Sequence, residues 1–170
     1  LVDIAERAGI QAGSLYYHFA SREELVAEIL QLGIATAFAQ VRQAVEELDG
    51  SDIESDSRRR LETAIRAHTM AVLEQSDYAS AQAKIVGQVP PDIAKAHKAD
   101  QRSYGAYWND LLETAANAGV LRADLDLFAA RMLAFGAMNW TTEWFDPSRR
   151  LSADQIADTA VMMIMSGLAK

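Results

Sequence analysis

The sequence predicts an all-α protein, and three observations support this. Apolar residues recur at the three- and four-residue spacing of amphipathic helices along most of the chain. A serine followed three residues later by Glu or Gln, which is a helix-start signal, occurs at Ser21 and again at Ser152. Only three of the 170 residues are proline, and long β-branched runs are few. We therefore expect helices from end to end of the chain.

The first two helices are short and meet at Gly9. Apolar residues recur at helical spacing before this glycine, at Val2, Ile4, Ala5 and Ala8. A glycine directly after the last periodic residue closes a helix, and Ile10 is then expected to pack into the core between the two helices. The second segment ends in an aromatic cluster, with Leu15 and Phe19 directed inward. Two short helices joined by a tight turn are typical of a DNA-reading helix-turn-helix.

Residues 4–25 carry a more specific pattern, I-A-x-x-A-G-I-x-x-G-S-L-Y-x-H-F-x-S-R-E-E-L. This order is similar to the N-terminal domain of the TetR family of bacterial repressors. The resemblance implies that the second helix is the recognition helix. The DNA-binding positions that it implies are Gln11, Ala12, Gly13, Ser14, Tyr16, Tyr17, His18 and Arg22.

These positions divide by their chemistry. Hydroxyl and imidazole groups donate to phosphate oxygens, which assigns Ser14, Tyr16 and His18 mainly to the DNA backbone. Gln11 and Tyr17 are the candidates for base edges in the major groove. Arg22 stands where the family usually keeps a Lys or Arg, at a helix N-terminus that itself favours a phosphate.

Two features depart from the family pattern. Ala12 occupies a position where the family often has Lys, and the helix that usually precedes this motif has no counterpart, so we expect further, usually basic, sequence before Leu1. Residues 1–48 carry three cationic and seven anionic side chains, within a net charge of −8. A strongly basic footprint is therefore absent. The alternative function is a ligand-binding or interaction protein of the same fold that has lost specific DNA binding.

The remaining elements follow from caps, prolines and periodicity. We expect further helices over residues 22–48, 58–75, 78–86 and 91–118, one from Asp124 or Asp126 to residue 144, and a last one from Ser152. Residues 49–52 are the clearest linker, and the acidic, serine-rich run up to Ser57 is expected as a solvated loop. The chain then divides into a helix-turn-helix domain with its connecting helix, residues 1–48, and a ligand-binding and dimerisation domain, residues 49–170.

The last helix is apolar on two faces. Ile156, Ala160, Met163, Ile164 and Gly167 share one side, and Val161, Met165 and Leu168 share another. A helix that is apolar nearly all round needs more than its own domain to cover it. The family resemblance implies a homodimer through the last two helices, with two recognition helices about one turn of DNA apart or a small multiple of it. Packing within one chain is the alternative.

Aromatic and sulfur-containing side chains gather in the middle and late helices, with isolated polar groups among them. Core packing explains any one of them, but their density together suggests a cavity for a hydrophobic ligand. The candidate ligand contacts are His68, Tyr104, Trp108, Arg131, Phe135, Met138 and Asn139. Residues 136–147, preceded by residues 119–124, resemble TetR-type regulators of lipid and steroid catabolism, which implies a fatty or steroid acyl-CoA effector. A polyaromatic drug or another hydrophobic metabolite is the alternative.

The sequence contains few of the motifs that would indicate an enzyme. The chain has no cysteine, so it has neither a disulfide nor a thiolate nucleophile, and Glu-x-x-His, Gly-x-Ser-x-Gly and glycine-rich phosphate motifs are missing. We expect no cofactor or metal, no membrane-spanning segment and a cytoplasmic location. The sequence thus predicts a repressor that binds operator DNA as a dimer and is released by a hydrophobic small molecule.

Overall fold

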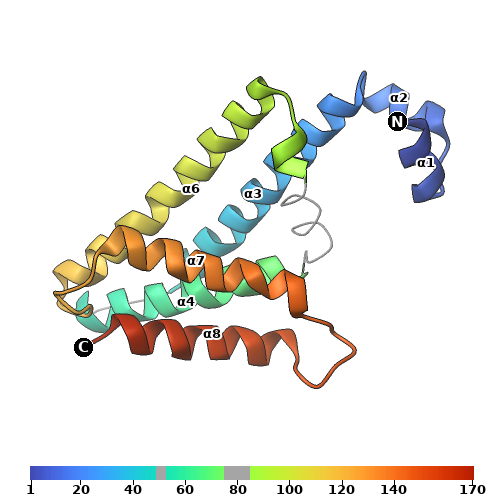
Figure 1. Cartoon of the computed structure of the whole chain (residues 1–170). Coiled ribbons are helices and arrows are strands. Elements are labelled where there is room, and N and C mark those ends of the chain that lie inside the picture. Colours follow the sequence, from blue (N-terminus) through green and yellow to red (C-terminus); the bar gives the residue numbers. More distant parts are fainter. Residues whose placement is uncertain (49–52, 75–84) are drawn as a thin grey trace.

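The computed structural model describes residues 1–48, 53–74 and 85–170 (Figure 1). Over these ranges the chain forms helices joined by turns, with a single isolated β-bridge between Leu121 and Ala169, which confirms the all-α prediction. The elements are α1 Val2–Ala8, α2 Ala12–His18, α3 Arg22–Glu46, α4 Ile53–Glu74, the 3-10 turn η1 Val86–Gln88, α6 Pro91–Asn117, α7 Leu127–Trp144 and α8 Ala153–Leu168.

Local helix signals are confirmed at four helix ends. Gly9 adopts the left-handed conformation, with φ 67°, and ends α1. Asp126 caps α7 by accepting from the amide of Ala129, and Ser152 opens α8 with a complete capping box. At the start of α3, Ser21 accepts from the Glu24 amide. The Glu24 carboxylate reaches one residue further back than expected, to the amide of Ala20.

The start of α4 differs from the prediction. The acidic, serine-rich residues up to Ser57 were expected as a loop, but the helix begins at Ile53. Asp56 pairs with Arg60 one turn later, and Ser57 is buried, so tertiary packing and an i,i+4 ion pair favour helix here. The expected loop is therefore wrong for residues 53–57. The helix expected over 78–86 falls mostly outside the described residues, and Val86 begins the 3-10 turn η1.

The second half of the molecule is built around α4. This helix packs against α3, α6, α7 and α8, and α3 also packs against α6. The buried core that these contacts enclose includes Val41, Val45, Leu61, Ala64, Ile65, Tyr104, Trp108, Leu112, Met138, Met165 and Leu168. Figure 1 shows α1 and α2 at the far end of α3, away from this core. The connecting helix α3 thus runs from the helix-turn-helix into the packed helices.

One helix of the described residues, α3, is long and apolar enough to cross a membrane by length and composition alone. Core helices meet the same criterion, and α3 contributes Val26, Leu30, Val41 and Val45 to the buried interior. The apolar character of α3 is thus used in packing against α4 and α6.

Candidate DNA-binding and effector sites

The side chains assigned to DNA lie mainly on the solvent side of α2. Leu15 of α2 is buried, whereas the two tyrosines that follow it are exposed, and Tyr17 is 85% exposed. Ala12 is half-buried. The remaining assigned positions are exposed: Gln11, Gly13, Ser14, His18 and Arg22. The rings of Tyr17 and His18 meet edge to face at 5.0 Å. A helix that buries one leucine and presents polar and aromatic groups outward has the form of a groove-reading helix.

The packing of the helix-turn-helix differs from expectation at Ile10. This side chain was expected between the two helices, yet it is 47% exposed. Its amide donates to the carbonyl of Ala5, 3.0 Å away, as the left-handed Gly9 reverses the chain. Ala5 and Leu15 are the buried residues of α1 and α2. The two short helices therefore meet through fewer apolar contacts than the sequence pattern indicated.

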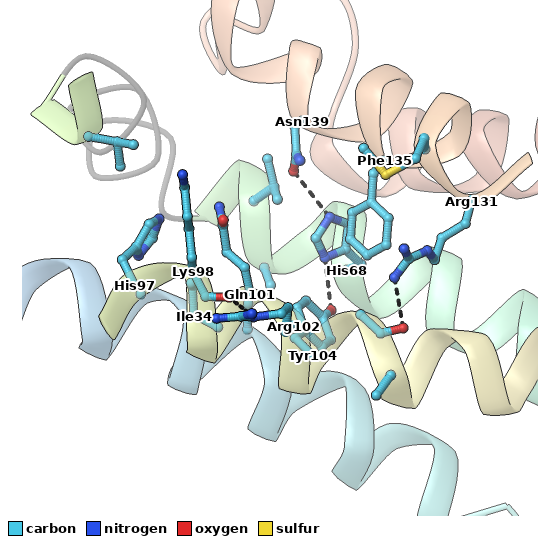
Figure 2. Close-up of a pocket in the computed structure, with 18 of the residues that line it drawn as sticks. Ile34, His68, His97, Lys98, Gln101, Arg102, Tyr104, Arg131, Phe135 and Asn139 are labelled. Atoms are coloured by element: carbon cyan, nitrogen blue, oxygen red, sulfur yellow. Dashed lines mark hydrogen bonds between the residues drawn. The ribbon is translucent and has the colours of Figure 1, made fainter. Parts of the chain in front are cut away.

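A cavity of about 870 Å³ lies between α3, α4, α6 and α7 (Figure 2), and Val86 of η1 also lines it. This volume falls within the range of small-molecule sites. Its apolar lining comes from residues that include Ile34, Ala37, Val72, Met132 and Phe135. Its polar lining comes mainly from α6, through His97, Lys98, Gln101, Arg102, Tyr104 and Asn109, with His68, Arg131 and Asn139 from α4 and α7.

The charge of the cavity lining contrasts with the acidic chain. Three permanent cations line it, Lys98, Arg102 and Arg131, and no Asp or Glu does so among the described residues. None of these three forms an ion pair with a carboxylate in the described part of the chain. Nδ1 of the buried His97 also lacks a partner there. The cavity is thus an amphipathic site with unmatched positive charge.

Five of the seven predicted ligand contacts lie on this cavity: His68, Tyr104, Arg131, Phe135 and Asn139. The other two, Trp108 and Met138, are buried in the core and line a separate, much smaller void beside Leu61 and Ile65. The sequence prediction missed Lys98, Gln101 and Arg102. Their spacing along α6 places them on one face, but a solvated helix face has the same pattern, so the sequence offered no signal that distinguishes them.

Arg131 joins α7 to α6 at one end of the cavity. Its Nη1 donates to the carbonyl of Gly105 at 2.8 Å, and its guanidinium lies 5.6 Å from the centre of the Phe128 ring. A Cβ at position 105 would collide with that Nη1, so a larger residue there would displace the end of the flexible Arg131 side chain. Arg131 Nε is buried and has no partner among the described atoms. One donor of this guanidinium therefore remains free beside the cavity.

His68 is 4% exposed and is held by two polar neighbours. The Tyr104 hydroxyl lies 2.9 Å from Nδ1, and Asn139 Oδ1 lies 3.1 Å from Nε2. Burial lowers the pKa of His68 from 6.5 to about 4, against a smaller opposing effect of the Asn139 hydrogen bond. Burial also raises the pKa of Tyr104. Both groups are therefore neutral near pH 7.

The lowered pKa of His68 makes folding stability depend on pH. The unfolded chain binds a proton here near pH 6.5 and the folded chain does not, so the stabilisation is complete above pH 6.5 and is lost as pH falls towards 4. We expect a loss of about 2 kcal/mol by pH 5. Urea unfolding of the wild type and of His68→Gln at pH 5 and pH 7 measures it. The variant should lose that much less on acidification; equal losses in both proteins would contradict the prediction.

The outer faces of α7 and α8 carry a set of exposed large apolar side chains. These are Leu133, Trp140 and Trp144 on α7, and Met162 and Met163 on α8, whereas the exposed Phe128 and Met132 lie on the α7 face that lines the cavity. Leu133, Trp140 and Trp144 are spaced by seven and four residues, so they share one face of α7. On α8 the two predicted faces divide differently from expectation, because Ile156 is buried while Met163 and Gly167 are exposed. Exposed apolar side chains that gather on two neighbouring helices in this way mark an interaction site.

Comparisons with known proteins agree with both halves of this description. Residues 1–29 match the family model of bacterial regulatory proteins of the tetR family, and residues 54–168 match the tetracyclin repressor-like C-terminal domain. The HTH-type transcriptional repressor KstR2 of Rhodococcus jostii (strain RHA1) is 30% identical, over 98% of this chain and 79% of the relative.

Two solved structures have the same fold. The ketosteroid transcriptional regulator KstR2 of Mycobacterium tuberculosis superposes with a TM-score of 0.81 and 26% identity, covering 99% of this chain and 84% of that one. The structure of AibR in complex with isovaleryl coenzyme A and operator DNA superposes with a TM-score of 0.72 and 22% identity, covering 95% of this chain and 84% of that one. With both of its halves matched, the chain belongs to the TetR family of transcriptional regulators, which are DNA-binding proteins rather than enzymes.

Proposed function

We propose that this regulator represses transcription in the cytoplasm by binding operator DNA as a dimer, and that an amphipathic anion in the cavity releases it. The observation that carries the proposal is the lining of the cavity. Three cations without a carboxylate partner among the described residues meet an apolar wall that contains Ile34 and Phe135. An anionic head with a hydrophobic body matches both parts.

A fatty or steroid acyl-CoA is the candidate effector. Its phosphates suit Lys98 and Arg102, which are exposed at one end of the cavity, and its acyl group suits the apolar wall. Figure 2 shows His97, Lys98 and Gln101 at one side of the view and Arg131 at the other, with His68 between them. The neighbouring fold of AibR was solved with isovaleryl coenzyme A and operator DNA, which supports this class. Free fatty acids share the same chemistry without the phosphates.

The dimer interface is assigned to α7 and α8. These helices carry the exposed apolar surface that includes Leu133, Trp140 and Met163. Packing against a second copy removes this apolar surface from water in both subunits at once, because a two-fold interface uses the same surface of each subunit. It also fixes the spacing of the two recognition helices, α2 of each subunit. An effector that favours a different packing of α7 changes this spacing, and the half-sites no longer match.

The test measures binding of the purified protein to the DNA upstream of its own gene. Fluorescence anisotropy gives the affinity at several salt concentrations, first alone and then with saturating decanoyl-CoA, decanoate or free coenzyme A. We expect sequence-specific, salt-dependent binding that decanoyl-CoA weakens more than coenzyme A does. Unchanged DNA affinity with every additive would contradict the effector assignment. Absence of specific DNA binding would favour the alternative, a family member that has lost its operator.

A further inference from the structure

A chain of hydrogen bonds joins three helices in the wall of the cavity. It runs from the Tyr104 hydroxyl on α6 through the His68 imidazole on α4 to the Asn139 amide on α7 (Figure 2). Tyr104 and His68 are buried, whereas Asn139 is exposed and lines the cavity. Asn139 is therefore the member of the chain that is most accessible to a bound molecule.

The directions of these hydrogen bonds depend on one another. A neutral imidazole has one donor nitrogen and one acceptor nitrogen. Because Asn139 places its oxygen against Nε2, that nitrogen donates, and Nδ1 accepts from the Tyr104 hydroxyl. The amide nitrogen of Asn139 then has no hydrogen-bond partner among the described residues. Its two N–H groups are free to donate to a molecule in the cavity.

The reverse arrangement is disfavoured. If the Asn139 amide turned over, its nitrogen would donate to Nε2, Nδ1 would donate to the Tyr104 oxygen, and the Asn139 oxygen would face the cavity. The hydroxyl proton of Tyr104 would then need another acceptor; among the described residues the acceptor that this hydroxyl meets is His68, and the neighbouring Trp108 indole can only donate. A buried hydroxyl without an acceptor disfavours that state by about five- to hundredfold. The chain therefore presents amide N–H groups, not an oxygen, to the cavity.

We propose that Asn139 selects ligands that carry a hydrogen-bond acceptor, above all a carbonyl oxygen, and that Tyr104 and His68 are positioning residues that fix its direction. This inference rests on the proposed function, in which the cavity is the effector site. A carbonyl accepts from the Asn139 amide without bringing a proton of its own. A hydroxyl in the same place brings a proton that needs a further acceptor, so it binds less well.

The experiment compares two neutral probes with one carbon skeleton, 2-tridecanone and 2-tridecanol. Direct titration by isothermal calorimetry at pH 7 gives the affinity of the purified protein for each. We expect the wild type to bind the ketone about three- to tenfold more tightly, which is the effect of one hydrogen bond. Asn139→Asp keeps the acceptor for His68 but presents no N–H group, so this preference should disappear or reverse.

Two further variants distinguish loss of the fixed hydrogen-bond direction from a general loss of ligand affinity. Tyr104→Phe removes the hydroxyl that sets the direction, so the ketone-to-alcohol ratio should fall towards one while affinity for the alcohol stays within about twofold. A merely structural role of Tyr104 would lower both affinities together. Asn117→Asp makes the same chemical change at an exposed residue of α6 outside the cavity lining and should keep the wild-type ratio. If Tyr104→Phe does not fold, the comparison of the two Asn→Asp variants still tests whether the ketone-to-alcohol preference depends on Asn139.

The possible failures are distinguishable. Equal binding of ketone and alcohol by the wild type, unchanged in Asn139→Asp, overturns the selection by Asn139 and leaves the effector site in place. Binding of neither probe overturns the inference as well. Whether the proposed function also fails is then decided by the separate DNA titration with decanoyl-CoA.

Discussion

The substitution Leu133→Glu is expected to convert the dimer into monomers and to weaken operator binding on the order of 100-fold. Leu133 is 75% exposed and lies in the apolar surface of α7 and α8 that we assign to the dimer interface. By two-fold symmetry each substitution places two carboxylates in this interface, where they lose hydration without gaining a partner. A monomer then binds one half-site at a time and loses the effective concentration that links the two.

Sedimentation velocity and fluorescence anisotropy measure these two effects. The variant should sediment close to the 18.6 kDa mass of one chain at concentrations where the wild type is dimeric. The matched control is Leu32→Glu, which makes the same change at an exposed leucine of α3, outside the proposed interface. A Leu133→Glu protein that remains dimeric and binds the operator like the control would place the interface elsewhere.

Features that depend on a few neighbouring residues could be predicted from the sequence. The left-handed Gly9 and the capping box at Ser152 each involve residues within four positions of one another. The start of α4 could not be predicted in this way, because Ser57 is drawn into the buried interior by helices that are distant in sequence. The prediction that Ile10 is buried fails for a related reason, since the exposure of this side chain depends on how α1 and α2 pack against each other.

The cavity could be predicted only in part. Isolated polar groups in apolar helices pointed to His68 and Asn139, and the structure joins them by a hydrogen bond across 71 residues of sequence. Lys98 and Arg102 could not be told from an ordinary solvated helix face, because a helix that lines an open cavity has the same pattern. Trp108 has the bulk expected of a ligand contact, yet bulk alone does not distinguish a cavity wall from a filled core.

The second large effect is expected on DNA affinity, from substitutions in the recognition helix α2 and at the start of α3. These substitutions distinguish contacts to base edges from contacts to phosphates. Tyr17→Ala is expected to weaken operator binding by about 1–3 kcal/mol in each half-site and to leave binding to unrelated DNA nearly unchanged, because Tyr17 is assigned to base edges. Arg22→Gln is expected to weaken binding to both DNAs and to reduce the slope of log affinity against log salt by about two per dimer, because each subunit loses one phosphate contact.

Both residues are exposed, so neither change removes buried packing, and circular dichroism should show unchanged helix content. The control for charge is Arg42→Gln, which removes an arginine from the same helix α3 at a distance from α2 and should leave the salt slope unchanged. The acidic balance of residues 1–48 makes this comparison informative, because few cations are available to contact phosphate. If Arg22→Gln and Arg42→Gln shift the slope equally, the long-range field of the protein governs binding, and the α3 N-terminus is not a phosphate contact. If Tyr17→Ala weakens binding to operator and unrelated DNA alike, Tyr17 contacts the backbone and sequence is read by other side chains of α2.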